Sequence, residues 1–471
     1  MKAKKILRIC FILLFLYVQV GHTQTPKYIF YFIGDGFGLS QSMLAENFLD
    51  ATARDTQTVH LHLWDLPEMG LSTTYSANSF VTCSSAAGTA LATGVKTNNN
   101  MLGVTPQQQP LTSIAKFLHK QGFLIGLISS VSIDHATPAA FYANVSSRNS
   151  YKDVALQLPT AGFEFLGGGG LKGAQNAPEI WDSLKKQGYF ISNNPSEIKK
   201  HTFDKGKIYA ISSNLCGEQD IPFRLEEPQH PMHLSYFVTQ MIRIFEPTNK
   251  PFFAMIEGGK IDWAAHYNDA AATLYEVIEM DSAFQIAYQF YLRHPNETLI
   301  IITADHETGG LSIGTEAKGY ACQPELLTYQ KQSIYTFRSH IKTLTRKSYT
   351  LQEIYTALNE QFSFDKHSDL ALTQKDSAQI NLFYKMQTDS LISNTLEYQN
   401  WKLTAPNSWS DLGNQIFCNK IGLGWTTGSH TGVAVPVRTI GVGTKYFRGS
   451  YTNSDIPLKI LKALNLPTTL N

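Results

Sequence analysis

Side chains that could bind metal ions occur in three short segments in the second half of the chain. Asp262 and His266 are four residues apart, so on a helix they project from one face and can bind the same ion. Asp305 and His306 are adjacent after an apolar run, and His430 lies among small residues. Each segment alone is more typical of a structural role. Together, their imidazoles and carboxylates form a ligand set that suits zinc.

A second group of possible ligands offers only oxygen atoms. Asp35 and Glu257 each follow an apolar run, and Thr137 adds a hydroxyl group. Oxygen ligands are typical of magnesium sites. Acidic side chains that share one site repel one another unless a cation neutralises them. The pattern therefore predicts a metal centre.

A possible nucleophile lies in the segment 81–94. Ser84 and Ser85 open a run of very small residues that ends at Gly94, and the run predicts a helix with Ser84 near its N-terminus. Free N–H groups and the helix dipole at such a position favour a phosphate group. A nearby metal ion could lower the pKa of the serine hydroxyl and so activate it. The segment by itself is equally typical of a packing helix that is capped by a serine.

Short apolar runs alternate with amphipathic stretches along the chain. This pattern predicts an α/β fold with a mostly parallel central sheet flanked by helices, and these elements must position the candidate residues. Predicted strands cover residues 28–33, 124–128, 252–256 and 299–303, and predicted helices cover 114–120, 234–245 and 270–290. Asp35, Glu257 and Asp305 follow three of these strands. Ligands bind at the carboxyl ends of strands in open α/β sheets, so the candidate site is expected there.

Residues from about 312 to 424 interrupt this rhythm. The stretch is rich in Gln, Thr, Ser, Asn and Lys, and it contains a predicted helix at 351–362. We interpret it as a large insertion in a single catalytic domain that covers residues 24–471. Long insertions are usually functional, so a homodimer contact or a lid is expected from it. The glycine run 167–170 lacks the ending of a nucleotide phosphate loop and predicts a tight turn.

The first 23 residues have the pattern of a signal peptide. A basic beginning with four Lys or Arg residues precedes an apolar run at 11–20 and a polar stretch. The apolar run is short for a transmembrane helix, so no membrane span is expected. The mature protein is expected to be periplasmic or secreted.

Charge and cysteine content limit the possible partners. Lys and Arg total 39 against 38 for Asp and Glu, so no basic field is available for nucleic-acid-specific binding. Of the 5 cysteines, Cys10 would leave with the signal peptide, and no Cys-x-x-Cys pair suggests a thiolate zinc site. Export permits disulfides, so Cys322 and Cys418, both in the insertion, are expected to pair.

Taken in combination, these segments resemble the alkaline phosphatases over about 28–311 and 425–443. In that family, a segment like 33–36 contains an aspartate that bridges a zinc ion and the magnesium ion. A segment like 84–89 contains the serine nucleophile, five residues before a threonine that matches Thr89, and this register selects Ser84 over Ser85. The arginine that binds the phosphate falls at Arg148. The resemblance implies two Zn2+ ions, one held by Asp262, His266 and His430 and one by Asp35, Asp305 and His306, and one Mg2+ ion held by Asp35, Thr137 and Glu257.

Three features depart from the family pattern. Cys83 stands where many members have an aspartate that orients the arginine, which implies a less restrained Arg148 and weaker phosphate binding. His135 and Trp263 replace an aspartate and a lysine of some bacterial members, so the chain resembles a bacterial type with a His/Trp variant of the third metal site. In such variants the third site is less selective for magnesium. The insertion resembles the family's variable crown region, which often reaches across a dimer interface, so a homodimer is expected.

The resemblance implies a secreted, metal-dependent hydrolase that cleaves small phosphate monoesters through a phosphoserine intermediate. A sulfatase of the same superfamily would need a Cys-x-Pro/Ala-x-Arg motif, and the residues after Cys83 lack the arginine. A phosphodiesterase usually lacks the counterparts of Arg148 and Glu257, and both are present. An exported zinc- or phosphate-binding protein without catalysis would have no need of Ser84 and Arg148 together.

Overall fold

The computed structural model describes residues 24–53, 59–389 and 406–470, and its centre is a ten-stranded sheet. The strand order is β14-β2-β13-β8-β1-β7-β3-β4-β6-β5, and only β13 runs antiparallel to its neighbours. The fold is thus the α/β fold with a mostly parallel sheet that the sequence predicts. The strands are β1 (Tyr28–Gly34), β2 (Glu68–Thr73), β3 (Leu124–Ser129), β4 (Phe165–Gly168), β5 (Tyr189–Ser192), β6 (Lys207–Ile211), β7 (Phe252–Gly258), β8 (Thr298–Ala304), β13 (Val435–Gly441) and β14 (Gly449–Thr452).

Helices cover both faces of this sheet. Side chains of β1 alternate between two hydrophobic cores, with Phe30 and Phe32 in one and Tyr31 and Ile33 in the other. The first core contains residues of α2 (Leu39–Thr52), α9 (Leu234–Phe245) and α11 (Ala270–Arg293), and the second contains residues of α3 (Ser84–Thr93), α4 (Ile114–Lys120), α6 (Tyr151–Ala161), α7 (Glu179–Lys186) and α17 (Asp455–Ala463). Burial on both faces explains why β1, β7 and β8 are almost continuously apolar.

The predicted strands and helices agree with the structure to within a few residues. The glycine run at 167–170 is a partial exception, because Gly167 and Gly168 end β4 and only the next two residues belong to a loop. A Cβ atom on Gly168 would come within 1.9 Å of the Ser129 carbonyl oxygen. The glycine therefore allows the close approach of β3 and β4. Among the described residues, no helix is long and apolar enough to cross a membrane.

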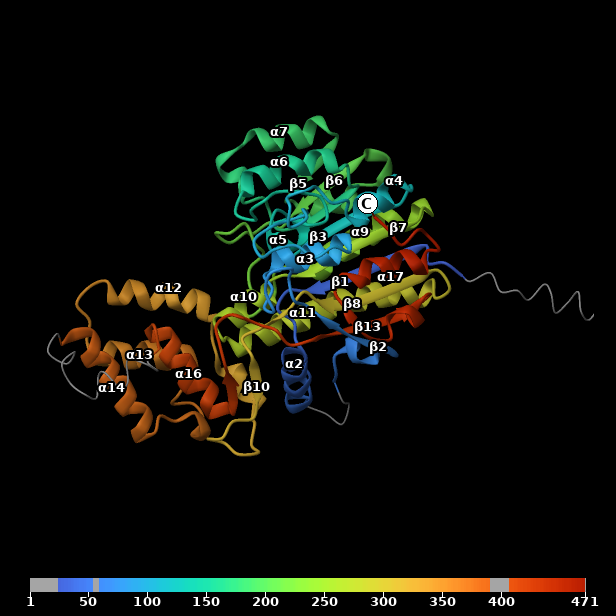
Figure 1. Cartoon of the computed structure of the whole chain (residues 1–471). Helices are drawn as coiled ribbons and strands as arrows, with labels where there is room; N and C mark the ends of the chain where they lie inside the picture. Colours follow the sequence, from blue (N-terminus) through green and yellow to red (C-terminus); the bar gives the residue numbers. More distant parts are fainter. Residues whose placement is uncertain (1–23, 54–58, 390–405, 471) are drawn as a thin grey trace, which may run out of the picture.

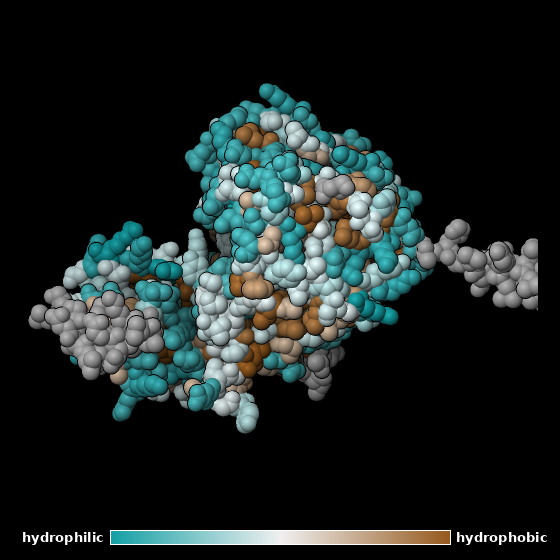
Figure 2. Space-filling model, viewed as in Figure 1, coloured by the Kyte–Doolittle hydropathy of each residue, from teal (hydrophilic) through white to brown (hydrophobic). Residues whose placement is uncertain are grey.

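The described residues of the segment 312–424 form a helical lobe beside the main body. It leaves and returns through β10 (Leu311–Ile313) and β11 (Leu423–Trp425), which pair antiparallel with Ser312 opposite Gly424. Figure 1 shows the lobe projecting to the left, and Figure 2 shows that its visible surface is largely hydrophilic. Its α-helices among the described residues are α12 (Ile334–Thr345), α13 (Leu351–Phe362), α14 (Gln374–Thr388) and α16 (Trp409–Ile421). The helix predicted at 351–362 coincides with α13.

The expected disulfide between Cys322 and Cys418 is wrong. Both thiols are free, as are those of Cys83 and Cys216. Cys418 is buried in α16, and its Sγ lies 3.9 Å from the carbonyl oxygen of Asn268 in the main body. The thiol therefore helps to seat α16 against the body.

A buried carboxylate, Asp269, joins the lobe to the main body. It is the N-cap of α11 and accepts a hydrogen bond from Ala272 N at 2.9 Å. It also accepts hydrogen bonds from Gln330 Nε2 at 2.7 Å and from Ile334 N, at the start of α12, at 2.6 Å. One side chain thus caps a helix of the body and the first long helix of the lobe.

Replacing Asp269 by alanine is expected to lower the free energy of unfolding by about 3 kcal/mol, because the change removes a helix cap and leaves buried donors without an acceptor. Asp269→Asn keeps one acceptor oxygen and is expected to recover part of the loss. Thr373→Ala removes the exposed cap of α14 and serves as the matched control, with a cost of about 1 kcal/mol. Urea unfolding measures all three variants. Equal losses for the two alanine variants would contradict the anchoring role.

Candidate active site

Three acidic side chains meet at the carboxyl ends of the central strands. Asp35 follows β1, Asp305 follows β8, and Glu257 is the penultimate residue of β7. β1 lies between β7 and β8, with Ile33 opposite Glu257. All three carboxylates are fully buried. Because adjacent parallel strands end at the same edge, the sheet itself brings these charges together.

Asp262, His266 and His430 form the first group of possible metal ligands. The helix α10 (Lys260–His266) presents Asp262 and His266 from one face, as their spacing predicts. Nε2 of His266 lies 3.3 Å from Asp262 Oδ2 and 3.1 Å from Nε2 of His430. His430 arrives through the pairing of β12 (His430–Thr431) with β9 (Glu307–Thr308). The three predicted ligands therefore converge, although His430 is 164 positions from His266.

Asp35, Asp305 and His306 form a second group next to the first. Nε2 of His306 lies 3.4 Å from Asp35 Oδ1 and 3.2 Å from Asp305 Oδ2. The backbone N–H groups of Gly36 and His306 donate to Asp305 Oδ1 at 3.1 and 2.8 Å. The rings of His306 and His430 stack with their centroids 3.5 Å apart, so the two groups adjoin.

The three imidazoles are oriented by hydrogen-bond partners at Nδ1. In His266 this atom lies 2.7 Å from the Gly428 carbonyl oxygen, and in His430 it lies 2.8 Å from the Thr82 carbonyl oxygen. In His306 it lies 3.2 Å from Thr308 Oγ1, which itself donates to Asp262 Oδ1 at 2.5 Å. Partners of this kind set the imidazole tautomer and leave Nε2 free to bind a metal.

Thr308 and the carbonyl groups of Thr82 and Gly428 were not singled out by the sequence patterns. Thr308 had a weak signal, because it follows His306 by two residues in the same motif. The two carbonyl oxygens gave no signal in the sequence, because every residue has a backbone carbonyl group.

A third group shares Asp35 with the second. Ligand atoms of Asp35, His135 and Glu257 lie within 4.8 Å of one another. Thr137, in α5 (Ala136–Ala139), lies near the Glu257 carboxylate, and Ser129 donates a hydrogen bond to that carboxylate. The structure thus places His135 itself among the possible ligands, in addition to the predicted Thr137.

Burial dominates the electrostatics of the site. It raises the pKa of Asp35 well above its usual range, and the charges of Asp305 and Asp262 add to the rise. Burial also raises the pKa of Asp305 to about 7 and that of Glu257 to about 8. On Asp262 burial acts in the same direction, but the hydrogen bond and charge of His266 outweigh it and lower that pKa. So many buried carboxylates are costly without a cation.

Several buried oxygen atoms here have no hydrogen-bond partner within the described residues. They are Oδ1 and Oδ2 of Asp35, Oδ2 of Asp305, Oε1 of Glu257 and Oγ1 of Thr137. Buried polar atoms in native proteins are rarely left unpaired, so each one needs an explanation. Coordination to cations would satisfy all of them. The mixed nitrogen and oxygen donors of the first two groups fit zinc, and the oxygen-rich third group fits magnesium.

Ser84 lies at the edge of this cluster as the first residue of α3, with Cys83 as the N-cap. Its Oγ is 3.4 Å from His306 Nε2. The hydroxyl of Ser85 is instead 3.2 Å from Cys83 Sγ. The N-terminus of α3, where free N–H groups and the helix dipole favour an anion, therefore lies beside the candidate metal ligands.

Arg148 reaches the site from the side of the third group. Its Nη2 lies 3.1 Å from His135 Nε2, and its backbone N–H donates to the Asn100 carbonyl oxygen at 2.7 Å. Burial lowers the pKa of His135 to about 3, so the ring is neutral and accepts a hydrogen bond from the guanidinium. Trp263 packs edge-on against His135, with centroids 5.8 Å apart. Cys83 Sγ accepts a hydrogen bond from Asn100 N at 3.1 Å, which couples it to the backbone that holds Arg148.

Comparison with known proteins identifies the family to which a chain with this site belongs. A family model described as alkaline phosphatase matches residues 26–164 and 158–466, which include every side chain of the site. The chain belongs to the alkaline phosphatase family. It is therefore a phosphomonoester hydrolase, which confirms the enzyme class expected from the sequence.

Relatives with similar sequences and structures support the assignment. Alkaline phosphatase 3 of Bacillus subtilis is 27% identical over 465 residues, covering 96% of this chain and 92% of its own length. The alkaline phosphatase of Schizosaccharomyces pombe is 28% identical over 461 residues, covering 93% and 81%. The crystal structure of the cold-active alkaline phosphatase from the psychrophile Shewanella sp. has a TM-score of 0.75 at 26% identity, covering 93% of this chain and 99% of that one.

Proposed function

We propose that this alkaline phosphatase hydrolyses small phosphate monoesters through a phosphoserine intermediate on Ser84. The observation that carries the proposal is the 3.4 Å approach of Ser84 Oγ to His306 Nε2, at a helix N-terminus beside buried imidazoles and carboxylates. A hydroxyl group in this position is close to the place where bound cations and a phosphate group would meet.

The donor atoms fit two zinc ions and one magnesium ion. Asp262, His266 and His430 would hold one zinc ion, Asp35, Asp305 and His306 the other, and Asp35, Thr137 and Glu257 the magnesium ion, with His135 and Trp263 forming a His/Trp variant of this third site. Bound metal ions would supply positive charge that lowers the pKa of a serine hydroxyl and of a water molecule and that neutralises the phosphate group.

The residues of the chain perform the remaining work in two steps. Ser84 Oγ gives its proton to water and attacks the phosphorus atom, and the bond to the leaving alkoxide breaks as the new O–P bond forms, after which the alkoxide takes up a proton from water. Arg148 and the N–H groups at the start of α3 bind the other phosphate oxygens. His135, which accepts a hydrogen bond from Arg148, orients the guanidinium in place of the carboxylate that Cys83 lacks. A water molecule then attacks the phosphoserine, releases phosphate and restores Ser84.

A homodimer is supported by exposed apolar side chains near the start of α3. Phe80 is 89% exposed, and Val81 and Val433 are also exposed. Gly432 lies next to the Phe80 carbonyl oxygen, so these side chains belong to one region. Exposed apolar groups of this kind are typical of protein contacts. The projecting lobe is a second possible contact, and light scattering of the mature chain tests the assembly.

A secreted or periplasmic location is supported by the signal-peptide pattern of residues 1–23, which lie outside the described residues. Sequencing the N-terminus of the exported protein tests the cleavage near residue 23. The nearly balanced charge supports small molecules rather than nucleic acids as partners.

The reaction class is tested with p-nitrophenyl phosphate and bis(p-nitrophenyl) phosphate. The monoester is expected to be the preferred substrate, and Arg148→Ala is expected to lower its kcat/KM by about 10- to 100-fold, because charge-assisted hydrogen bonds to the phosphate are lost. The diester has fewer free oxygen atoms and is expected to lose less. Lys152→Ala removes an exposed cation that pairs with Glu179 and serves as the control. A preference for the diester in the unmodified enzyme would contradict the proposal.

A further inference from the structure

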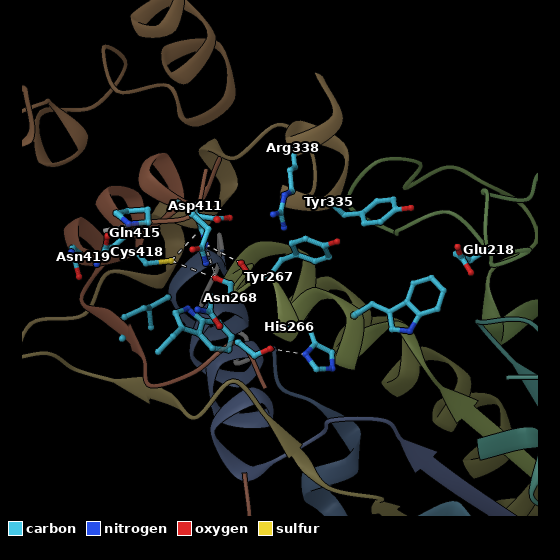
Figure 3. Close-up of a pocket in the computed structure, with 18 residues that line it drawn as sticks. Glu218, His266, Tyr267, Asn268, Tyr335, Arg338, Asp411, Gln415, Cys418 and Asn419 are labelled. Atoms are coloured by element: carbon cyan, nitrogen blue, oxygen red, sulfur yellow. Dashed lines mark hydrogen bonds between the residues drawn. The ribbon is translucent and has the colours of Figure 1, made fainter. Parts of the chain in front are cut away.

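A large pocket opens beside the candidate active site, between the main body and the lobe. Its volume is about 860 Å³, which lies within the range of small-molecule sites. Its lining includes His266 and Gly428, residues of α10, and residues of α12 and α16 of the lobe. The pocket therefore adjoins a predicted metal ligand, so a group attached to a phosphate bound at that ligand would have room to extend into it (Figure 3).

One wall of this pocket is aromatic. Trp263 and Tyr267 are four residues apart at the end of α10, so they lie on one side of the helix. Tyr335, from α12, meets Tyr267 edge to face with the ring centroids 5.7 Å apart. Figure 3 shows the two tyrosine rings side by side, with Arg338 extending toward Tyr267. The body and the lobe thus build this wall together.

Charged and amide side chains complete the lining. The guanidinium of Arg338 lies 5.7 Å from the centre of the Tyr267 ring. Glu218 is paired with Lys172, but Arg338 and Asp411 form no ion pair with any residue of the described segments. They leave a hydrogen-bond donor and an acceptor available inside the pocket. Gln415 and Asn419 add exposed amides from α16.

We propose that this pocket binds the nucleoside part of nucleotides, so that nucleoside monophosphates are the preferred monoesters. The inference rests on the proposed monoester hydrolysis. Bases stack on aromatic side chains and on guanidinium groups, and their edges carry both donors and acceptors. An aromatic wall beside the guanidinium of Arg338, the carboxylate of Asp411 and two amides matches that chemistry. A sugar phosphate has no base that could stack on this wall.

The test compares adenosine 5′-monophosphate with ribose 5-phosphate, which lacks the base. The wild-type enzyme is expected to favour the nucleotide about tenfold in kcat/KM, and Tyr335→Ala and Arg338→Ala are expected to reduce this ratio about five- to tenfold. Tyr335→Phe keeps the ring and is expected to keep the ratio. Arg346→Ala removes an exposed arginine at the end of α12, away from the pocket, and serves as the matched control.

Binding of adenosine without a phosphate group gives a readout that does not need turnover. Adenosine should inhibit the enzyme competitively and bind in equilibrium dialysis, and Tyr335→Ala should weaken both effects about five- to tenfold. Equal kcat/KM for the two substrates, or a ratio that the alanine variants leave unchanged, would overturn the inference. Absence of activity on p-nitrophenyl phosphate would instead refute the proposed function, and adenosine binding would still report on the pocket.

Discussion

Ser84→Ala is expected to lower kcat for p-nitrophenyl phosphate by about a thousandfold or more, because it removes the oxygen atom that forms the phosphoserine. Ser84 Oγ is the hydroxyl that lies 3.4 Å from His306 Nε2 at the start of α3. Slow hydrolysis by activated water is expected to remain. Brief incubation with labelled phosphate at acid pH, followed by peptide mapping, locates the modified residue.

Ser85→Ala is the matched control for this experiment. Ser85 is also buried at the start of α3, but its Oγ lies 3.2 Å from Cys83 Sγ. The side chains of successive residues in a helix point in directions about 100° apart, so only one of the two hydroxyls faces the candidate metal ligands. Most of the activity is expected to survive this change. Label on Ser85, or an inactive Ser85→Ala beside an active Ser84→Ala, would reverse the assignment.

Prolonged chelation followed by dialysis is expected to reduce activity by about a hundredfold or more and to lower the melting temperature by about 5 °C or more. Four buried carboxylates, Asp35, Glu257, Asp262 and Asp305, repel one another once no cation balances them. Adding zinc and magnesium together should restore both quantities. Calorimetry and metal analysis of the same samples connect the loss of stability to the loss of the ions.

The variant Asp262→Asn tests the metal requirement at one of the two predicted zinc sites. Asp262 lies within 3.5 Å of both His266 and His430, so loss of its charge should weaken zinc retention and activity together. Asp365→Asn, on the exposed surface of the lobe, is the matched control and should retain the zinc content of the parent enzyme. Full activity after exhaustive chelation, with zinc absent by analysis, would disprove the metal requirement.

The sequence alone determined those features of this protein that depend on local geometry. Apolar runs of strand length predicted β1, β3, β7 and β8, because a strand buried on both faces must be apolar throughout. The spacing of Asp262 and His266 predicted that both lie on one face of a helix, and the small residues after Ser84 predicted α3. The family resemblance rests on the same short segments, so the types of the metal ligands follow from local sequence.

Only the tertiary structure decided the features that depend on distant segments meeting. The short pairing of β12 with β9 places His430 beside His266, and packing of α5 against the site places His135 under Arg148. The tertiary structure also places the Cys418 thiol beside Asn268 and not beside Cys322. It brings a helix of the body and a helix of the lobe together to form the aromatic wall of the pocket. Periodicity and spacing report neighbours within about two helical turns or along one strand. Contacts across a hundred or more residues are set by how the buried faces fit together, and a single sequence does not contain that information in local form.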